Sequence, residues 1–342
     1  MTAPARGPSA PGLGLAFALV LGGCATHGVQ SVLDPAGRHA ALTLAIWREM
    51  LWVCGAAYVL VLGFFALAAL RACRTREAPE PLPGAEEGLH IALWGWIALT
   101  GIGLVALAVG SFLVDRRAAA AGEGAEIHVR VTAHQWWWEV EYLDSAPARR
   151  FVTANELHLP LSVPARIELR SKDVIHSFWV PNLNGKVDLI PGRDNEIALL
   201  PEREGTYRGQ CAEFCGLQHA HMAFDVTVES RDAFDAWREA QLAPAAVPSD
   251  PRARDGMRQF AASHCVMCHS IRGTPANGRV APDLTHVASR PSIAAGTLPN
   301  RRGYLAAWIA DPQTAKPGNH MPYIGLEPAR LDALLAYLES LR

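Results

Sequence analysis

Hydrophobic residues gather in three continuous runs in the first third of the chain. Leu13–Gly23 is too short to span a bilayer and follows a segment whose only charged residue is Arg6, so it predicts the core of a secretory signal. Leu51–Leu70 holds 20 residues without a charge, and Ile91–Val114 forms a second long run. A helix of about 20 apolar residues covers the ~30 Å of membrane hydrocarbon, so these two runs predict a transmembrane hairpin.

The residues around the hairpin predict its orientation. The RACRTR segment between the two runs holds three arginines, and Lys or Arg close to a span favour the cytoplasmic side. An exported N-terminus followed by two spans then puts everything after Arg117 outside the cytoplasm. The LGGC at Leu21–Cys24 resembles a bacterial lipobox, in which Cys24 carries the lipid; an uncleaved anchor or an ordinary signal is the alternative.

From about Ala125 the pattern changes to short alternating or β-branched runs separated by turn residues. EIHVRVTA, RIELRS, NEIALLP and AFDVTVES are such runs, and their spacing predicts an all-β sandwich or barrel. A short amphipathic helix is expected at Arg231–Gln241, and the QLAPAAVPSDP that follows is typical of an extended linker. Apolar residues at helical spacing predict helices at Asp255–His264, Tyr304–Asp311 and Pro328–Leu341.

Composition and charge narrow the functional classes. The 342 residues are enough for two or three domains, and a formal net charge of −2 offers no basic excess for nucleic acid. Residues 252–342 hold eleven Lys and Arg against six Asp and Glu, whereas residues 124–231 hold eleven against fifteen. We therefore expect the C-terminal segment to dock electrostatically on the β-domain.

The stretch GQCAEFCGLQHAHMAF concentrates soft metal ligands, a combination that selects copper or a similar metal. Cys211 and Cys215 can bridge two copper ions, each of which then needs an imidazole. His219 supplies one from the same loop, and Met222 offers a weak axial donor. His176, in DVIHSFWVP, is the best candidate for the second imidazole, because a sandwich brings distant loops together at one end. The alternative is a structural zinc site or a redox disulfide, neither of which uses the methionine.

Three stretches resemble one known family. CAEFCGLQHAHM matches the C-x-E-x-C-x3-H-x2-M loop of cytochrome c oxidase subunit II, which holds the dinuclear copper A centre. SKDVIHSFWVPNLNGKVDLIPG and HQWWWEVEY resemble two further stretches of that family, and the likeness covers about Asp34–Glu229. The resemblance implies a cupredoxin-like sandwich and a copper A site formed by six residues: His176, Cys211, Glu213, Cys215, His219 and Met222.

The resemblance also implies a role for each of these residues. The two cysteines bridge the coppers; His176 and Met222 complete one metal, and His219 with the backbone carbonyl of Glu213 completes the other. The Glu213 carboxylate is expected to face subunit I, where the family uses it on an interface magnesium ion. His221 is less well spaced than His219 and is expected beside the site or on the surface.

The triple tryptophan Trp136–Trp138 contains the point where electrons are expected to enter. Alternate residues of a strand face opposite ways, so at least one of the three should point outward. In the family the first aromatic of this run lies over the copper centre, which gives that role to Trp136 and leaves Trp137 and Trp138 structural. Four histidines lack a ligand-spaced partner and are expected to be ordinary hydrogen-bonded residues: His128, His134, His158 and His286.

CVMCH is the C-x-x-C-H pattern of c-type haem attachment, with covalent bonds from Cys265 and Cys268 and an axial bond from His269. The layout of residues 252–342 resembles the class I cytochrome c fold. In that family the proline carbonyl of the APDL segment, here that of Pro282, accepts a hydrogen bond from the axial histidine and orients it.

The haem iron needs a sixth ligand. Met321, in NHMPYIG, lies some fifty residues beyond the attachment motif and before the terminal helix. Histidine–methionine ligation raises the haem potential and suits electron transfer. Met257, Met267 and His320 are the weaker candidates.

These features indicate the electron-input subunit of a haem–copper oxidase, an oxidoreductase subunit with a fused cytochrome c domain. Electrons are expected to pass from an external donor through haem c and copper A to subunit I, where oxygen is reduced to water. Expected partners are subunits I and III and a donor such as a cytochrome c or a quinol–cytochrome c reductase, with no nucleic acid. The alternatives are the input subunit of a copper A-type nitric oxide reductase and a membrane-tethered copper carrier.

The predicted fold is multidomain: a signal peptide of the lipoprotein type at 1–23, an N-terminal segment with the two-helix transmembrane hairpin at 24–118, an all-β cupredoxin-like copper A domain at 119–240, a linker at 241–251 and an all-α class I cytochrome c domain at 252–342. The chain is expected in the bacterial cell (inner) membrane with both cofactor domains on the periplasmic face. Glu86, Glu87 and His90, at the start of the second span, are candidates for proton uptake or for a helix cap and subunit contacts.

Overall fold

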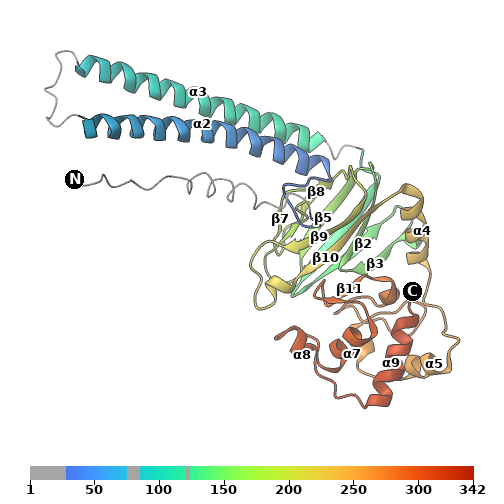
Figure 1. Ribbon diagram of the computed structural model, residues 1–342. Helices are drawn as coiled ribbons and strands as arrows, with labels where there is room; N and C mark the ends of the chain where they lie inside the picture. The colour runs from blue at the N-terminus through green and yellow to red at the C-terminus, as the bar shows by residue number, and fades with distance from the viewer. Residues whose placement is uncertain (1–27, 75–84, 121–123) are drawn as a thin grey trace, which may run out of the picture.

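The computed structural model describes residues 28–74, 85–120 and 124–342, and the predicted signal at 1–23 and Cys24 lie outside these residues. Along the molecule, a helical hairpin is followed by a β-sandwich and then by a helical domain at the opposite end of the sandwich (Figure 1). The order of the three parts is the one that the hydrophobic pattern predicts.

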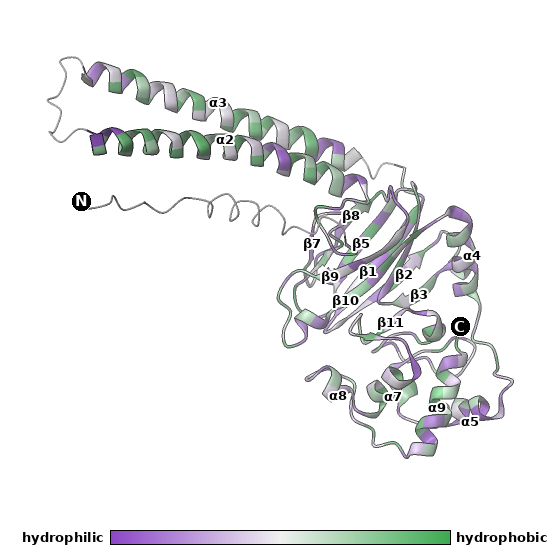
Figure 2. Cartoon of the chain, in the orientation of Figure 1, coloured by the Kyte–Doolittle hydropathy of each residue, from purple (hydrophilic) through white to green (hydrophobic). Residues whose placement is uncertain are grey.

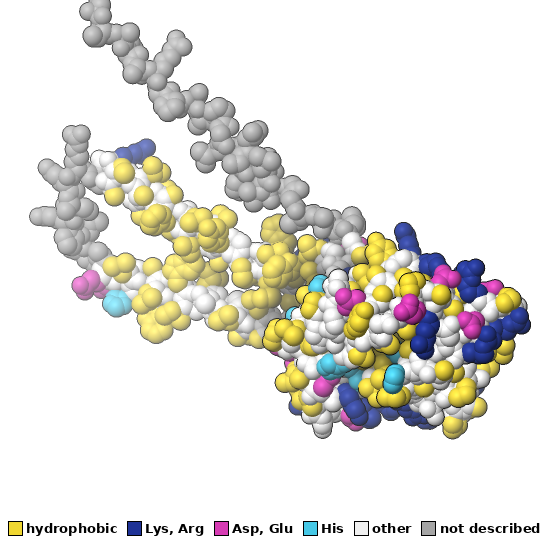
Figure 3. Space-filling model, turned by 90° about the horizontal axis from the view of Figure 1, so that it is seen from below, with side chains coloured by type: hydrophobic (Ala, Val, Ile, Leu, Met, Phe, Trp, Pro, Cys, Tyr) yellow, Lys and Arg dark blue, Asp and Glu magenta, His cyan; other side chains and the backbone are white. Residues whose placement is uncertain are grey.

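The hairpin consists of α2 (Arg38–Arg74) and α3 (Ala85–Ala120), which lie side by side (Figure 1). By length and composition both helices can cross a membrane. Their apolar side chains are exposed around the helices, whereas the globular part mixes charged and apolar groups (Figures 2 and 3). A helix that is apolar on all sides needs an apolar environment, so this surface fits contact with lipid.

Asn182 connects the start of the hairpin to the sandwich. Its buried side chain donates to the carbonyls of Gly28 and Asp34, at 2.9 Å each, and its own backbone carbonyl accepts from Ala36 N–H at 2.6 Å. Because the side chain and the backbone carbonyl of this one residue satisfy three backbone groups, the chain enters α2 from a fixed position on the sandwich.

The sandwich is built from two five-stranded sheets, ordered β3-β2-β1-β5-β8 and β4-β10-β9-β6-β7. Along β1, buried residues alternate with more exposed ones, because successive side chains of a strand face opposite sides of the sheet. The strands are β1 (Ile127–His134), β2 (Trp137–Leu143), β3 (Phe151–Ala154), β4 (Glu156–Pro160), β5 (Ala165–Ser171), β6 (His176–Trp179), β7 (Val187–Leu189), β8 (Asn195–Leu199), β9 (Gly205–Cys211) and β10 (Ala223–Glu229).

Aromatic rings fill the space between the sheets. Trp138 is fully buried and lies 6.2 Å from Phe178 and 5.2 Å from Phe224, measured between ring centroids. Pairs at such distances contribute roughly 0.5–1.5 kcal/mol beyond the burial of their area. On the outer flank, α4 (Arg231–Leu242) stacks Trp237 on His158 at 4.0 Å. Trp138 is therefore structural, as the sequence predicts.

The C-terminal domain is helical, and its helices begin and end within a few residues of the predicted ones. Its largest contact is the crossing of the first and last helices, where Gly256 lies against the backbone of Ala333. Its elements are α5 (Pro251–Ala261), α6 (Cys265–Cys268), β11 (Ser292–Ile293), β12 (Leu298–Pro299), α7 (Arg302–Ala310), α8 (Pro312–Ala315) and α9 (Pro328–Ser340).

The segment expected to be a linker is extended but bonded to the C-terminal domain. The Arg272 guanidinium donates to the carbonyls of Gln241 and Leu242, and Ala245 N–H donates to the carbonyl of Arg272 at 2.9 Å. Backbone groups that are paired in this way leave the segment little freedom to act as a flexible tether.

The helix crossing predicts a strong effect of one added methyl group. A Cβ at Gly256 would lie 1.9 Å from the carbonyl oxygen of Ala333, so Gly256→Ala forces α5 and α9 apart. We expect this overpacking to lower the free energy of unfolding by about 1–3 kcal/mol, measured by hydrogen exchange of the α9 amides in the intact chain. Gly303→Ala is the control, because nothing lies within 4 Å of a Cβ at that position of α7. Equal α9 exchange in the two variants would contradict the argument.

Candidate metal centre and cofactor cavity

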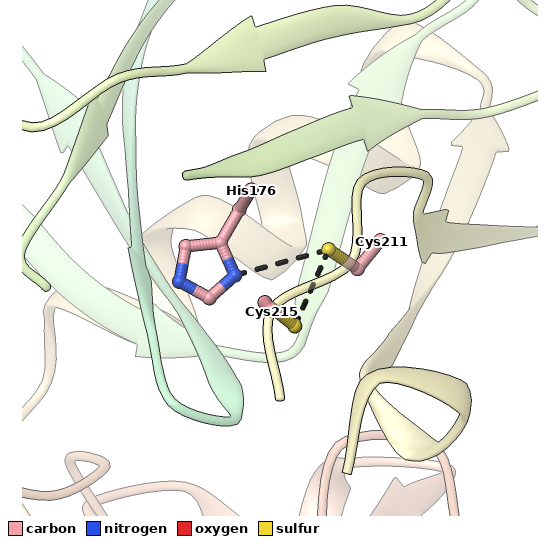
Figure 4. A group of neighbouring side chains, drawn as sticks. All are labelled: His176, Cys211 and Cys215. Atoms are coloured by element: carbon pink, nitrogen blue, oxygen red, sulfur yellow. Dashed lines mark hydrogen bonds between the residues drawn. The ribbon is translucent and has the colours of Figure 1, made fainter. Parts of the chain in front are cut away.

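The two cysteines of the predicted copper loop lie at the end of the sandwich that faces the C-terminal domain. Cys211 ends β9, Cys215 follows in the next loop, and both are buried. Their sulfurs are 3.8 Å apart, against about 2.05 Å in a disulfide, so the pair is not oxidised (Figure 4). Two unbonded sulfurs at this distance can both contact the same metal ions.

His176 approaches this pair from β6. Its Nδ1 lies 3.8 Å from Cys211 Sγ (Figure 4). Its Nε2 lies 2.8 Å from Asp173 Oδ1. Burial opposes protonation of His176, but the hydrogen bonds to Asp173 and Cys211, together with the charges of these two groups, outweigh it and raise the pKa of the imidazole. Because Nε2–H donates to the carboxylate, Nδ1 keeps its lone pair for a metal. The sequence analysis missed Asp173, although its position three residues before His176 is a signal for such a partner.

The remaining predicted ligands surround the same two sulfurs. His219 Nδ1 is 3.7 Å and Met222 Sδ is 3.8 Å from Cys215 Sγ, and the carbonyl oxygen of Glu213 is 3.2 Å from Cys211 Sγ. The structure thus brings all six predicted residues together. Sulfur, imidazole, thioether and carbonyl donors of this kind suit copper.

The two thiols shift each other's pKa in opposite directions. The hydrogen bond with Cys215 lowers the pKa of Cys211. Burial raises this pKa, and the hydrogen bond from His176 lowers it further. The same contact, together with burial, raises the pKa of Cys215. A metal binds the thiolate form of cysteine, so metal binding would remove the remaining thiol proton of the pair.

Trp136 connects the copper loop to the C-terminal domain. Its Nε1 donates to the carbonyl of Cys215 at 2.9 Å, and the Gln135 amide donates to the same oxygen at 2.8 Å. On its other side the ring of His320 lies 5.7 Å away, and Trp136 is only 7% exposed. Trp136 is therefore covered by the C-terminal domain and not open to solvent. Trp137 stacks on His134 at 4.3 Å.

The other histidines lie outside the set of six. His221 is exposed and pairs with Gln218 at 2.8 Å. His128 and His286 contact backbone carbonyls, and His158 lies 2.8 Å from Glu229. These four have ordinary hydrogen-bond partners. For His134 the same prediction is not met at the buried Nε2, which has no hydrogen-bond partner among the described residues, because the ring stacks on Trp137.

The second predicted cofactor site is an open cavity of about 720 Å³. The two cysteines and the histidine of CVMCH line it, and Met321 lines the same cavity. His269 Nδ1 is 2.7 Å from the Pro282 carbonyl, which leaves Nε2 free for a metal. Trp136 and Trp137 line the same cavity from the sandwich. An apolar cavity with these donors fits a haem.

The three other candidates for the sixth haem ligand lie at different places in the C-terminal domain. Met257 packs in the core of the C-terminal domain. Met267 lines the cavity but is 65% exposed, on the attachment turn itself. His320 lines the cavity with its ring beside Trp136. Met321 and His320 both line the cavity from the segment between α8 and α9.

Lys316 is a further residue that the sequence analysis did not identify. Burial lowers its pKa to about 7, and the electrostatic interaction with nearby Cys215 acts in the opposite direction. It is the only lysine between residues 252 and 342, but a single basic residue in a basic segment gives no signal of burial.

Comparison with known families assigns both domains. Residues 127–230 match the family described as cytochrome c oxidase subunit II, periplasmic domain, and residues 253–342 match cytochrome c. The crystal structure of the periplasmic domain of subunit II of cytochrome oxidase from Bradyrhizobium japonicum is 30% identical, with a TM-score of 0.33, over 35% of this chain and 96% of that one.

Full-length relatives extend the match to nearly the whole chain. Cytochrome c oxidase subunit 2 of Alkalihalophilus pseudofirmus is 33% identical over 95% of this chain and 94% of its own length. The protein of the same name from Bacillus sp. (strain PS3) is 35% identical over 79% of this chain and 80% of its own. The chain belongs to the cytochrome c oxidase subunit 2 family, as a membrane-anchored oxidoreductase subunit with a copper A-type domain and a fused C-terminal cytochrome c domain.

Proposed function

We propose that this chain passes electrons from an external donor through a covalently bound haem c and a dinuclear copper A centre to subunit I, which reduces oxygen to water. The observation that carries the proposal is the position of Trp136 between the two cofactor sites. Its indole is hydrogen-bonded to the Cys215 carbonyl on one side and lies 5.7 Å from the His320 ring on the other. We call residues 119–240 the copper domain and residues 252–342 the haem domain.

In the copper domain, Cys211 and Cys215 bridge the two metals. His176 and Met222 complete one copper, and His219 with the Glu213 carbonyl completes the other. Each bridging sulfur would contact both metals. The sulfur that lies nearest to a ligand in the structure therefore does not show which copper that ligand would bind. Bound copper A supplies a one-electron carrier, and the rigid, buried ligand set limits the change in geometry on reduction.

In the haem domain, Cys265 and Cys268 form the thioether bonds, and His269 and Met321 are the axial ligands. Pro282 orients His269 through the 2.7 Å contact of its carbonyl, and burial lowers the pKa of His269. The neutral imidazole is the form that binds iron. Two protein ligands close the iron to substrates, which suits electron transfer.

The surroundings of the chain follow from this role. The hairpin anchors it in the bacterial inner membrane beside subunits I and III, with the cofactor domains on the periplasmic face. The Glu213 carboxylate faces subunit I and a magnesium ion. A cytochrome c or a quinol–cytochrome c reductase supplies electrons to the haem domain.

Electron paramagnetic resonance of the purified oxidase tests the copper assignment. We expect hyperfine splitting from one electron shared by two equivalent coppers, together with a low-spin haem spectrum. Cys215→Ser removes a bridging sulfur and should abolish that pattern, whereas His221→Ala should preserve it, because His221 is exposed and outside the set of six. A single-copper spectrum, or copper lost to a mild chelator, would favour a copper carrier instead.

The sixth haem ligand is tested by a matched pair of variants. Met321→Ala should remove the methionine-to-iron charge-transfer band, open the iron to carbon monoxide and lower the haem potential, which axial ligands set over a range of ~0.8 V. Met267→Ala should leave all three unchanged, although Met267 also lines the cavity. If Met267→Ala gave these effects and Met321→Ala did not, the assignment would be wrong.

A further inference from the structure

We call the contact that residues 290–320 of the haem domain make with the copper domain the docking interface. Their segment, with β11, lies directly below the sandwich (Figure 1). The Ala223 N–H donates to the Ala295 carbonyl at 3.0 Å, and the Gln218 amide donates to the Pro317 carbonyl at 2.7 Å. Both donors belong to the copper domain, next to the loop that carries the copper ligands.

Arg290 extends from the haem domain into the copper domain. Its side chain is 7% exposed and donates to Glu156 Oε1 at 3.4 Å and Thr153 Oγ1 at 3.3 Å, and also to the Asp283 carbonyl of its own domain at 2.7 Å. Burial opposes ionisation of Glu156, but the hydrogen bond to His158 and the charge of Arg290 outweigh it and lower its pKa. Removing one member of such a buried pair leaves the other charge uncompensated.

Lys316 is the second basic side chain at the docking interface. It is 2% exposed, and its Nζ donates to the carbonyls of Trp136 at 3.0 Å, His221 at 2.8 Å and Ala294 at 3.2 Å. Two of these acceptors belong to the copper domain. The contact persists when the amine loses a proton, because a neutral amine still donates two hydrogen bonds.

The backbones of the two domains also approach closely. Gly296 has a φ of +70°, and a Cβ there would lie 3.0 Å from Ala223 Cβ. The docking interface therefore has interior-like packing as well as polar contacts. Salt screens exposed charges over about 10 Å at 0.1 M but affects buried pairs much less. The buried Arg290–Glu156 pair is therefore expected to depend less on salt than the attraction between exposed charges of the two domains.

We propose that Arg290 and Lys316 are positioning residues that keep the haem domain docked throughout turnover, so that Trp136 stays covered and no soluble donor can bypass the haem. This differs from a tethered domain that docks and releases. The proposal stands on the contacts of the described residues and is independent of the metal ligands. It also gives Lys316 a direct effect on electron transfer, because it holds the peptide of Trp136 itself.

The chain contains three lysines, which allows a direct test in the intact oxidase. Lys172 and Lys186 are exposed, whereas Lys316 is covered only while the domains are docked. With an acetylating N-hydroxysuccinimide ester and mass spectrometry, we expect Lys316 to react at least ~100-fold more slowly than Lys172 at low and at high salt. Reaction within about threefold of Lys172, or faster reaction at high salt, would overturn the proposal.

A pair of arginine variants tests whether the two contacts open together. Arg290→Met should make Lys316 react at least ~10-fold faster, because loss of one contact favours undocking of the whole interface. Arg302→Met is the control, since Arg302 pairs with Asp332 on the exposed surface of the haem domain. No acceleration in Arg290→Met, or equal acceleration in both variants, would show that the contacts do not act as one unit.

Lys316→Met connects the interface to the rate of electron transfer. We expect haem-to-copper transfer, followed after flash reduction, to slow at least ~10-fold while the copper resonance spectrum stays unchanged. An unchanged rate of haem-to-copper transfer would show that Lys316 is not a positioning residue. Labelling does not depend on electron transfer. If the wild-type protein did not pass electrons from haem to copper, the labelling result would still report on docking, and only the proposed function would be contradicted.

Discussion

The pairing of β6 with β9 is the interaction on which the metal centre depends. Phe178 lies opposite Cys211 in the register, so the end of β9 and the start of β6 meet at the same edge of the sheet. That register brings His176 to a cysteine 35 residues away along the chain. A slip of one residue would turn every side chain of β6 to the other face and remove the imidazole from the site.

The core beneath this edge fixes it in place. Trp138 packs against Phe178 and Phe224, which lie two residues after His176 and Met222 respectively. Its ring lies 6.3 Å from that of His176. Close-packed interiors transmit displacement with little loss, so the ligands inherit the rigidity of the sandwich. A carrier that reorganises little on changing redox state needs such a support.

The haem domain completes the arrangement by covering the face that Trp136 presents. On the proposed electron path, Trp136 receives electrons from a domain of its own chain through a fixed contact, and not from a soluble donor that binds transiently. The covered face is stabilised by buried hydrogen bonds from Arg290 and Lys316, which depend on geometry and only weakly on salt. The segment after α4, which is hydrogen-bonded to the haem domain, fits the same conclusion, because a domain that stays docked needs no long flexible linker.

The sequence by itself determined the three-part order, the two long apolar helices and the β-sandwich, and it supplied the candidate residues of both cofactor sites. These follow from local signals: hydrophobic period, turn residues and ligand spacings such as C-x3-C and C-x-x-C-H. Tertiary structure decided the rest. Asp173 behind His176, the burial of Trp136, and the contacts of Arg290 and Lys316 join residues up to 180 positions apart. No period or spacing encodes which surface of one domain covers another, because that depends on shape and on buried hydrogen bonds formed only when both domains are folded.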